Sequence, residues 1–206
     1  MVSVASAQSY LAGVRNHHID RGYDISIFND ERFKRIIKGA KHVIGTVPPH
    51  PWKEITKDIL LTILPHLNRN TFDDLNIFTA FCTTFAAFLR CGEFTWDSWN
   101  PDSHLFHLSR HSVQFLDNYV TLHLPSSKTD PYCQGTLVPL AQSPDPACPV
   151  KALSLLFTCY PTRNPSDPLF SCMFSPFNQA WVINRLQSTL LAAGIDPTSF
   201  SGHSFR

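Results

Sequence analysis

The 206-residue sequence has few charged residues and no closely spaced pair of cysteines. Charged residues make up 16% of it and hydrophobic residues 43%, a balance typical of a globular chain rather than a disordered one. Its six cysteines form no C-x-x-C pair, so zinc-knuckle and thioredoxin-like sites are excluded. Met1–Gln8 has neither the basic nor the apolar segment of a secretory signal, so we expect reduced thiols and an intracellular protein.

Long hydrophobic runs are also absent. The most apolar stretch, Leu75–Leu89, is interrupted by polar residues and is too short to span a bilayer, so we expect no membrane association. It is apolar on nearly all sides, which predicts a buried helix at the centre of a domain, with Phe78, Phe81 and Phe85 inside. Sixteen phenylalanines against two methionines indicate an aromatic core.

The pattern of hydrophobic residues predicts a mainly helical α+β fold. We expect helices over 3–20, 30–43, 56–64, 71–89, 150–160 and 178–193. We expect strands over 113–116, 119–124 and 136–140, joined in a small three-stranded antiparallel sheet, and a short extended piece over 168–170. A proline-rich linker over 46–55 would separate a helical domain over 1–45 from a larger domain over 56–206.

Positive charge is concentrated near the beginning of the chain. Residues 1–70 contain ten Lys and Arg against six Asp and Glu, whereas residues 71–206 contain seven against ten. The densest cluster lies on the helix expected over 30–43 and consists of Arg32, Lys34, Arg35, Lys38 and Lys41. Lys34, Lys38 and Lys41 would share one face of this helix, with Phe33, Ile36, Ile37 and Ala40 on the buried face. Such a charged face is usually only solvated, and binding of a phosphate backbone is the functional alternative.

Three short motifs could carry chemistry, although each is weak alone. Arg90 is expected at the end of the buried helix, where an unpaired cation needs a partner or an anionic ligand, and Glu93 could be that partner. Lys128 lies in a polar turn between two expected strands. His203 and Arg206 form a G-H-x-x-R motif, and they would share one face of a helix beginning near residue 201.

In this order and at these distances, the motifs resemble the active site of tyrosine recombinases, the phage-integrase family. The segment CPVKAL at 148–153 resembles the start of the helix that follows the hairpin in this family. The run FLRCGEFTW at 88–96 is most similar to recombinases of eukaryotic mobile elements, such as fungal Crypton-like transposons. The resemblance implies that 56–206 is an incomplete recombinase catalytic domain and that 1–45 is the end of a helical core-binding domain.

The resemblance also implies a reaction and a role for each residue. Tyrosine recombinases cut double-stranded DNA without a metal or cofactor, through a tyrosine that becomes linked to a 3′-phosphate. Arg90 and Arg206 would neutralise the reacting phosphate, Lys128 would protonate the leaving 5′-oxygen, and His203 would assist proton transfer. Glu93 would orient Arg90. The cluster from Arg32 to Lys41 would bind DNA, on which copies of the protein would assemble in the nucleus.

The nucleophilic tyrosine of this family follows H-x-x-R, whereas all five tyrosines of this sequence precede His203. We therefore expect the chain to bind DNA without cleaving it, as a piece of a longer gene product or of a decayed element. The alternative is a non-catalytic DNA-binding or scaffold protein that keeps the fold. A metal site among His17, His18 and Asp20, or among His104, His107 and His111, is a weaker hypothesis, because neither spacing matches a helical H-E-x-x-H motif.

Overall fold

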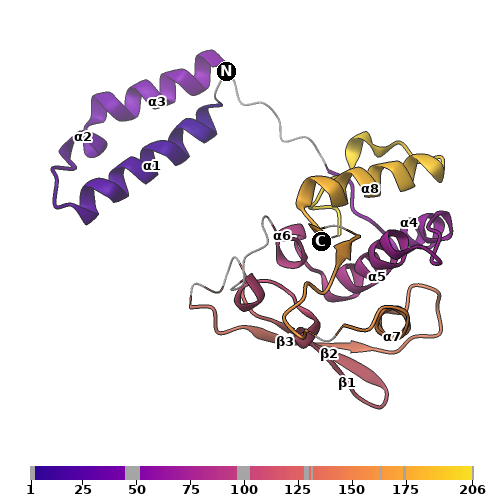
Figure 1. The fold of residues 1–206 in the computed structure, drawn as a ribbon. Coiled ribbons are helices and arrows are strands. Elements are labelled where there is room, and N and C mark those ends of the chain that lie inside the picture. The colour runs from indigo at the N-terminus through magenta and orange to yellow at the C-terminus, as the bar shows by residue number, and fades with distance from the viewer. Residues whose placement is uncertain are drawn as a thin grey trace. The chain divides into compact units, whose positions relative to one another are not determined.

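In the computed structural model the chain divides into two compact units, Met1–His50 and Pro51–Arg206 (Figure 1). The structure describes residues 3–44, 52–96, 103–127, 130, 132–162, 164–173 and 175–205. The expected linker over 46–55 therefore lies partly outside the described residues. Within these ranges, no helix has both the length and the apolar character needed to cross a membrane.

The first unit is a helical hairpin. It consists of α1 (Val4–Asp20), the short α2 (Ser26–Asn29) and α3 (Glu31–Ile44). The Ser3 hydroxyl accepts a hydrogen bond from the Ser6 N–H at the start of α1. The Asp30 carboxylate accepts one from the Arg32 N–H at the start of α3. Both long helices confirm the prediction, whereas α2 was not predicted.

The first unit buries few of its side chains. Among its described residues only Val4 is buried, and Phe33, Ile37 and Ala40 are half-buried. The prediction that Ile36 lies inside is wrong, since 66% of this residue is exposed. The reason is that the packed stripe of α3 follows positions 33, 37 and 40, and Ile36 lies beside that stripe.

The second unit contains the remaining helices and strands. In chain order these are α4 (Lys57–Ile63), η1 (Leu64–His66), α5 (Phe72–Ala87), α6 (Cys91–Phe94), η2 (Ser103–Leu105), η3 (Arg110–Ser112), β1 (Val113–Phe115), β2 (Tyr119–Leu124), β3 (Thr136–Ala141), α7 (Pro149–Cys159), β4 (Ser171–Cys172), β5 (Ser175–Pro176), α8 (Gln179–Ala192) and η4 (Pro197–Ser199). The predicted long helices and the three strands of the sheet are confirmed. The β4–β5 hairpin was not predicted, because strands of two residues show no periodicity.

Helix α5 forms the centre of the second unit. The sheet and α7 lie on one side of it and α8 on the other (Figure 1). Its residues from Leu75 to Thr84 are all buried, and Phe85 is half-buried. The Thr79 hydroxyl donates to the Leu75 carbonyl at 2.8 Å, so this polar group is satisfied inside the core. The predicted burial of this helix is confirmed.

The three longer strands form one antiparallel sheet in the order β1-β2-β3. Val120 pairs with Leu140 and Leu122 with Val138, and alternate residues of β2 face the core. The turn before β2 is closed by a hydrogen bond of 2.9 Å from the Leu116 N–H to the Tyr119 carbonyl. This turn contains the predicted pair Asp117-Asn118.

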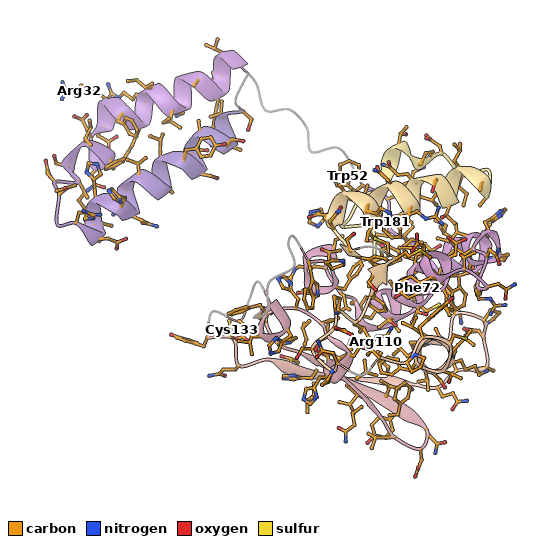
Figure 2. All side chains as sticks on the ribbon, in the orientation of Figure 1. Arg32, Trp52, Phe72, Arg110, Cys133 and Trp181 are labelled. Atoms are coloured by element: carbon orange, nitrogen blue, oxygen red, sulfur yellow. The ribbon has the colours of Figure 1, made fainter. Side chains whose placement is uncertain are left out.

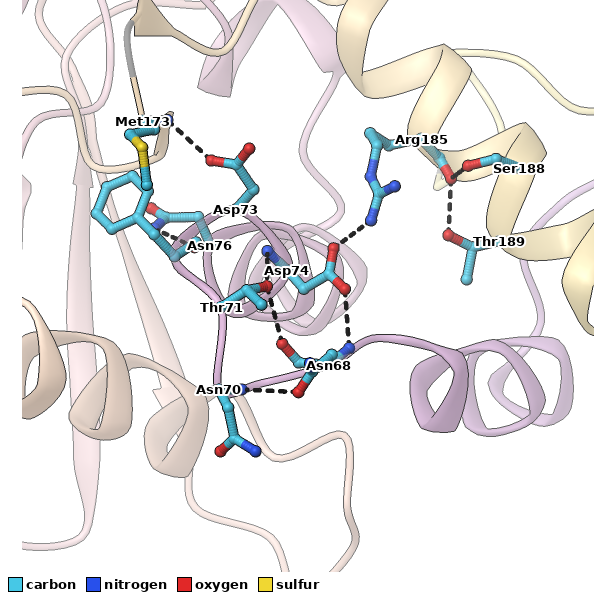
Figure 3. Close-up of polar contacts among 11 residues, drawn as sticks. Asn68, Asn70, Thr71, Asp73, Asp74, Asn76, Met173, Arg185, Ser188 and Thr189 are labelled. Atoms are coloured by element: carbon cyan, nitrogen blue, oxygen red, sulfur yellow. Dashed lines mark hydrogen bonds and ion pairs between the residues drawn. The ribbon is translucent and has the colours of Figure 1, made fainter.

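Polar side chains at the start of α5 attach two other elements to it (Figure 3). The Asp74 carboxylate accepts a hydrogen bond of 2.8 Å from the Asn68 N–H and forms an ion pair with Arg185 of α8. Asp73 accepts from the Met173 N–H at 2.8 Å, which holds the end of the β4 strand. The first turn of α5 is therefore joined to both α8 and the β4–β5 hairpin.

Candidate functional site

Arg90 occupies the N-cap position of α6 rather than the end of α5. Helix α5 ends at Ala87, and Phe88 follows in the left-handed conformation with φ 51°. Leu89, only 2% of which is exposed, is then buried in the core before α6 begins. The prediction that Arg90 ends the long helix is therefore wrong, because helix α5 stops three residues before Arg90.

Glu93 holds both the backbone and the side chain of Arg90. Its Oε2 accepts a hydrogen bond of 2.7 Å from the Arg90 N–H, and its Oε1 accepts one of 2.8 Å from Arg90 Nη1. The pairing predicted from the spacing of these two residues is present. A guanidinium has five N–H groups, so this pairing leaves donors for an anionic ligand. A quarter of the Arg90 side chain is exposed, compared with 10% of the Glu93 side chain.

Residues 201–205 form a closed turn instead of the start of a helix. The Ser204 N–H donates to the Ser201 carbonyl at 3.0 Å, and the Ser201 N–H donates to the Ser204 hydroxyl at 2.9 Å. Ser204 and Phe205 are buried, and the Phe205 ring lies 5.2 Å from that of Phe81 in α5. These reciprocal bonds close the turn, so the expected helix does not form within 201–205. His203 is exposed on it.

The turn packs directly against the residue that follows Arg90. A methyl group added at Gly202 would lie 3.0 Å from Cys91 Cβ and 3.3 Å from Gln179 Nε2. The backbone at Gly202 can approach Cys91 this closely because glycine has no side chain. The fold therefore brings Gly202, at the start of the motif, beside the segment of the Arg90–Glu93 pair, although the two are far apart in the sequence.

The thiol of Cys91 is a structural group rather than a reactive one. Burial raises its pKa to about 11, and a hydrogen bond with Thr95 acts in the opposite direction. A thiol with such a high pKa stays protonated near neutral pH and is a poor nucleophile. Within the described ranges, no group of three or more His, Cys, Asp and Glu side chains could hold a metal ion.

Two of the predicted catalytic residues, Lys128 and Arg206, lie outside the described residues. Their predicted roles therefore remain predictions. Of the five predicted catalytic residues, the structure describes Arg90, Glu93 and His203, and it places their segments side by side.

The five cations predicted to bind DNA are exposed on α3 of the first unit. Arg32 is labelled in Figure 2. Arg32 pairs with Asp30 at 2.8 Å, and Lys34 pairs with Glu31 at 2.7 Å. Both pairs are solvent-exposed, and such pairs contribute little free energy, so a phosphate can replace the carboxylate at low cost. The remaining cations, for which no ion pair with a described residue is present, are Arg35, Lys38 and Lys41.

Lys34, Lys38 and Lys41 share one side of α3, as predicted. All three line a groove of about 410 Å³ between α1 and α3, together with Arg15 of α1. The groove therefore has a rim of four positive groups, two of them one helical turn apart on α3. A surface of this kind attracts a polyanion.

Arg110 of η3 is a buried cation that the sequence analysis did not single out. It is only 8% exposed, compared with a quarter of the Arg90 side chain. The available signal was its place two residues after Leu108 and three residues before a strand, in a segment that has to enter the core. Its environment is described below.

The second unit has the fold of a tyrosine recombinase catalytic domain, a mainly helical α+β domain with a small antiparallel sheet. The chain is similar to a pre-cleavage complex of XerH site-specific recombinase bound to difH substrate, with a TM-score of 0.52 and 12% identity. It is also similar to a post-cleavage complex of XerH with a palindromic difH substrate, with a TM-score of 0.51 and 15% identity.

These similarities cover unequal parts of the compared chains. The alignment with the pre-cleavage complex covers 99% of this chain and 57% of the XerH chain. The alignment with the post-cleavage complex covers 76% of this chain and 40% of the XerH chain. This chain thus spans about half the length of the recombinases it resembles. No protein-family model matches the sequence, and no curated protein sequence matches it.

The contact between Gly202 and Cys91 can be tested by substitution. We expect Gly202→Ala to lower the free energy of unfolding by about 1–3 kcal/mol, because the new methyl group overlaps a well-packed region. Gly92→Ala is the matched control, since a methyl group there meets nothing within 4 Å. Urea unfolding followed by tryptophan fluorescence measures both. Equal stability of the two variants would show that the turn does not pack on Cys91.

Proposed function

We propose that this chain is a DNA-binding part of a tyrosine recombinase. The observation that supports the proposal is the contact of Gly202 with Cys91, which places the segments that contain His203 and the Arg90–Glu93 pair side by side within a recombinase fold. A cation and a histidine on neighbouring segments suit a phosphodiester, whose charge increases in the transition state. The two similar XerH structures are complexes with difH substrate, which supports DNA as the ligand.

In the proposed reaction, Arg90 and Arg206 neutralise the non-bridging oxygens of the reacting phosphate, because a planar guanidinium matches a phosphate with two hydrogen bonds. Lys128 gives a proton to the leaving 5′-oxygen, and His203 assists this transfer. Glu93 is a positioning residue. Its bond to the Arg90 backbone supports this role, since the bond holds the start of α6 as well as the guanidinium.

The nucleophile of the proposed reaction is a tyrosine of the longer gene product, downstream of Arg206. The second candidate is a non-catalytic DNA-binding or scaffold protein with the same fold. Sequencing the transcript beyond codon 206 separates the two. A tyrosine about nine residues after a His or Trp there supports the recombinase, and an open reading frame without one supports the scaffold.

We propose that residues 1–45, which make up most of the first unit, are the end of a core-binding domain that helps to hold the duplex. The exposed cations of α3 support this assignment. We further propose that the gene belongs to a Crypton-like mobile element, that copies of the protein assemble on DNA and that they act in the nucleus. The resemblance of the run FLRCGEFTW supports the first of these statements.

Titration of a labelled duplex with the purified chain tests DNA binding. Fluorescence anisotropy measures the affinity at salt concentrations between about 50 and 200 mM, a range in which phosphate contacts have a large effect on binding. We expect the logarithm of the association constant to fall linearly with the logarithm of the salt concentration, by roughly 0.9 for each neutralised phosphate. Binding that does not respond to salt, or no binding at the lowest salt concentration, would contradict the proposal.

A further inference from the structure

A second candidate site lies in the second unit, around Arg110. A cavity of about 560 Å³ is lined by residues of η3, α7, the start of α5 and the β4–β5 hairpin. Phe72, which lines it and is labelled in Figure 2 together with Arg110, is the first residue of α5, whereas Arg90 lies three residues beyond the last. A helix rises 1.5 Å per residue, so most of α5 separates this part of the cavity from Arg90. The cavity is therefore independent of the proposed recombinase site.

Arg110 is buried at this cavity with unsatisfied hydrogen-bonding capacity. Its Nη1 is inaccessible to solvent and has no hydrogen-bond partner among the described residues. The guanidinium lies 4.6 Å from the centre of the Phe157 ring, which stabilises the charge only in part. Leaving a buried donor without an acceptor is unfavourable, and this is more so for a charged group.

Asp167 is the acidic residue whose charge acts on Arg110, but its carboxylate forms hydrogen bonds with other side chains. Its carboxylate accepts hydrogen bonds from the Thr162 hydroxyl and from Asn164 Nδ2, the second at 3.1 Å. Burial lowers the pKa of Arg110, and the charge of Asp167 partly opposes this effect. Asp167 thus compensates the cation through space without satisfying Nη1.

One part of the cavity wall is apolar and held in place, whereas Arg110, Asp167 and hydroxyl side chains line the rest. The rings of Phe72 and Tyr160 meet edge to face at 4.7 Å, and Pro168 and Met173 complete this surface. The Met173 backbone is held by Asp73, as described above. Ligand sites typically combine apolar walls with a few polar groups in this way, and the volume is in their usual range.

We propose that this cavity binds a carboxylate that carries an apolar or aromatic group, with Arg110 as its ion-pair partner. A planar carboxylate matches the guanidinium fork, and Arg110 lines the cavity. A single negative charge suits the site better than a phosphate dianion, because Asp167 already places one negative charge at the cavity. The apolar group would contact Phe72, Tyr160 and Met173.

The test uses 3-phenylpropanoate as the probe and the backbone amide NMR signals of the ¹⁵N-labelled chain as the readout. We expect saturable shifts at Tyr160, Thr162 and Met173. The neutral 3-phenylpropanamide should bind about tenfold more weakly or worse, since it lacks the charge-assisted bond. Phenyl phosphate should also bind more weakly than the carboxylate.

Variants assign the interaction to Arg110. Arg110→Met should weaken binding of 3-phenylpropanoate by about tenfold or more, because it removes the ion-pair partner. Asp167→Asn should strengthen binding by about 3-fold, because it removes a charge that repels the carboxylate. Arg69→Met is the matched control, because Arg69 also lies over a phenylalanine ring, at 5.1 Å from that of Phe78, but does not line this cavity. It should leave the affinity unchanged.

Arg110→Lys keeps the charge, so it provides a second variant if Arg110→Met does not fold. It should bind more weakly than the parent, because an ammonium lacks the planar fork. Absence of saturable shifts in the parent would overturn the proposal. The proposal would also be overturned if the parent and the Arg110 variants had equal affinities for 3-phenylpropanoate, or if the acid and the amide bound equally well. Tighter binding of phenyl phosphate than of the carboxylate would overturn it too.

Discussion

Phe81→Ala is expected to lower the free energy of unfolding of the second unit by about 3–5 kcal/mol. Phe81 has 0% exposure at the centre of α5, and its ring lies against that of Phe205. Removing the ring leaves a cavity in the core and also removes the contact that holds the end of the 201–205 turn. Urea unfolding followed by circular dichroism measures the loss. The expected loss is a large part of the free energy of unfolding of a typical domain, which is about 5–15 kcal/mol.

Phe88→Gly is the control for this substitution, because it also removes a phenylalanine ring near α5. Phe88 is 68% exposed and adopts a left-handed conformation, with φ 51°, that glycine adopts more easily. We expect this variant to be as stable as the parent or more stable by up to about 1 kcal/mol. A loss at Phe81 no greater than that at Phe88 would show that α5 is not the core.

Replacing Lys34, Lys38 and Lys41 together by glutamine is expected to weaken DNA binding by about tenfold or more at low salt. The salt slope should decrease by about 3, which is one for each lost phosphate contact. The effect should be about equal for duplexes of any sequence, because phosphate contacts carry little sequence information. Glutamine has nearly the same helix propensity as lysine, so α3 should persist.

A variant of the second unit with the same loss of charge is the control. Lys53, Lys57 and Lys151 are exposed and are not part of the proposed DNA-binding cluster. Their replacement by glutamine should change the salt slope much less. If both triple variants bind DNA like the parent, the α3 cluster is a solvated face and the first unit does not hold DNA.

Much of the secondary structure could be predicted because its causes are local. Thr71 and Asn178 accept hydrogen bonds from the first turns of α5 and α8, and a side chain three residues away is enough for this. The Arg90–Glu93 pair was predictable for the same reason, since three residues separate its members. The exposure of Ile36 was not predictable in this way, because it depends on the width of the α3 surface that α1 covers.

The candidate sites themselves depend on contacts between distant parts of the chain. The sequence alone determined the long helices, the three-stranded sheet and the order of the motifs, because caps, turns and hydrophobic periodicity act over a few residues. Only the tertiary structure decided that Gly202 packs on Cys91 and that Arg110 is a buried cation with an N–H that no described residue accepts. Burial and pairing of a charge are set by which segments pack around it, and no local pattern specifies that packing.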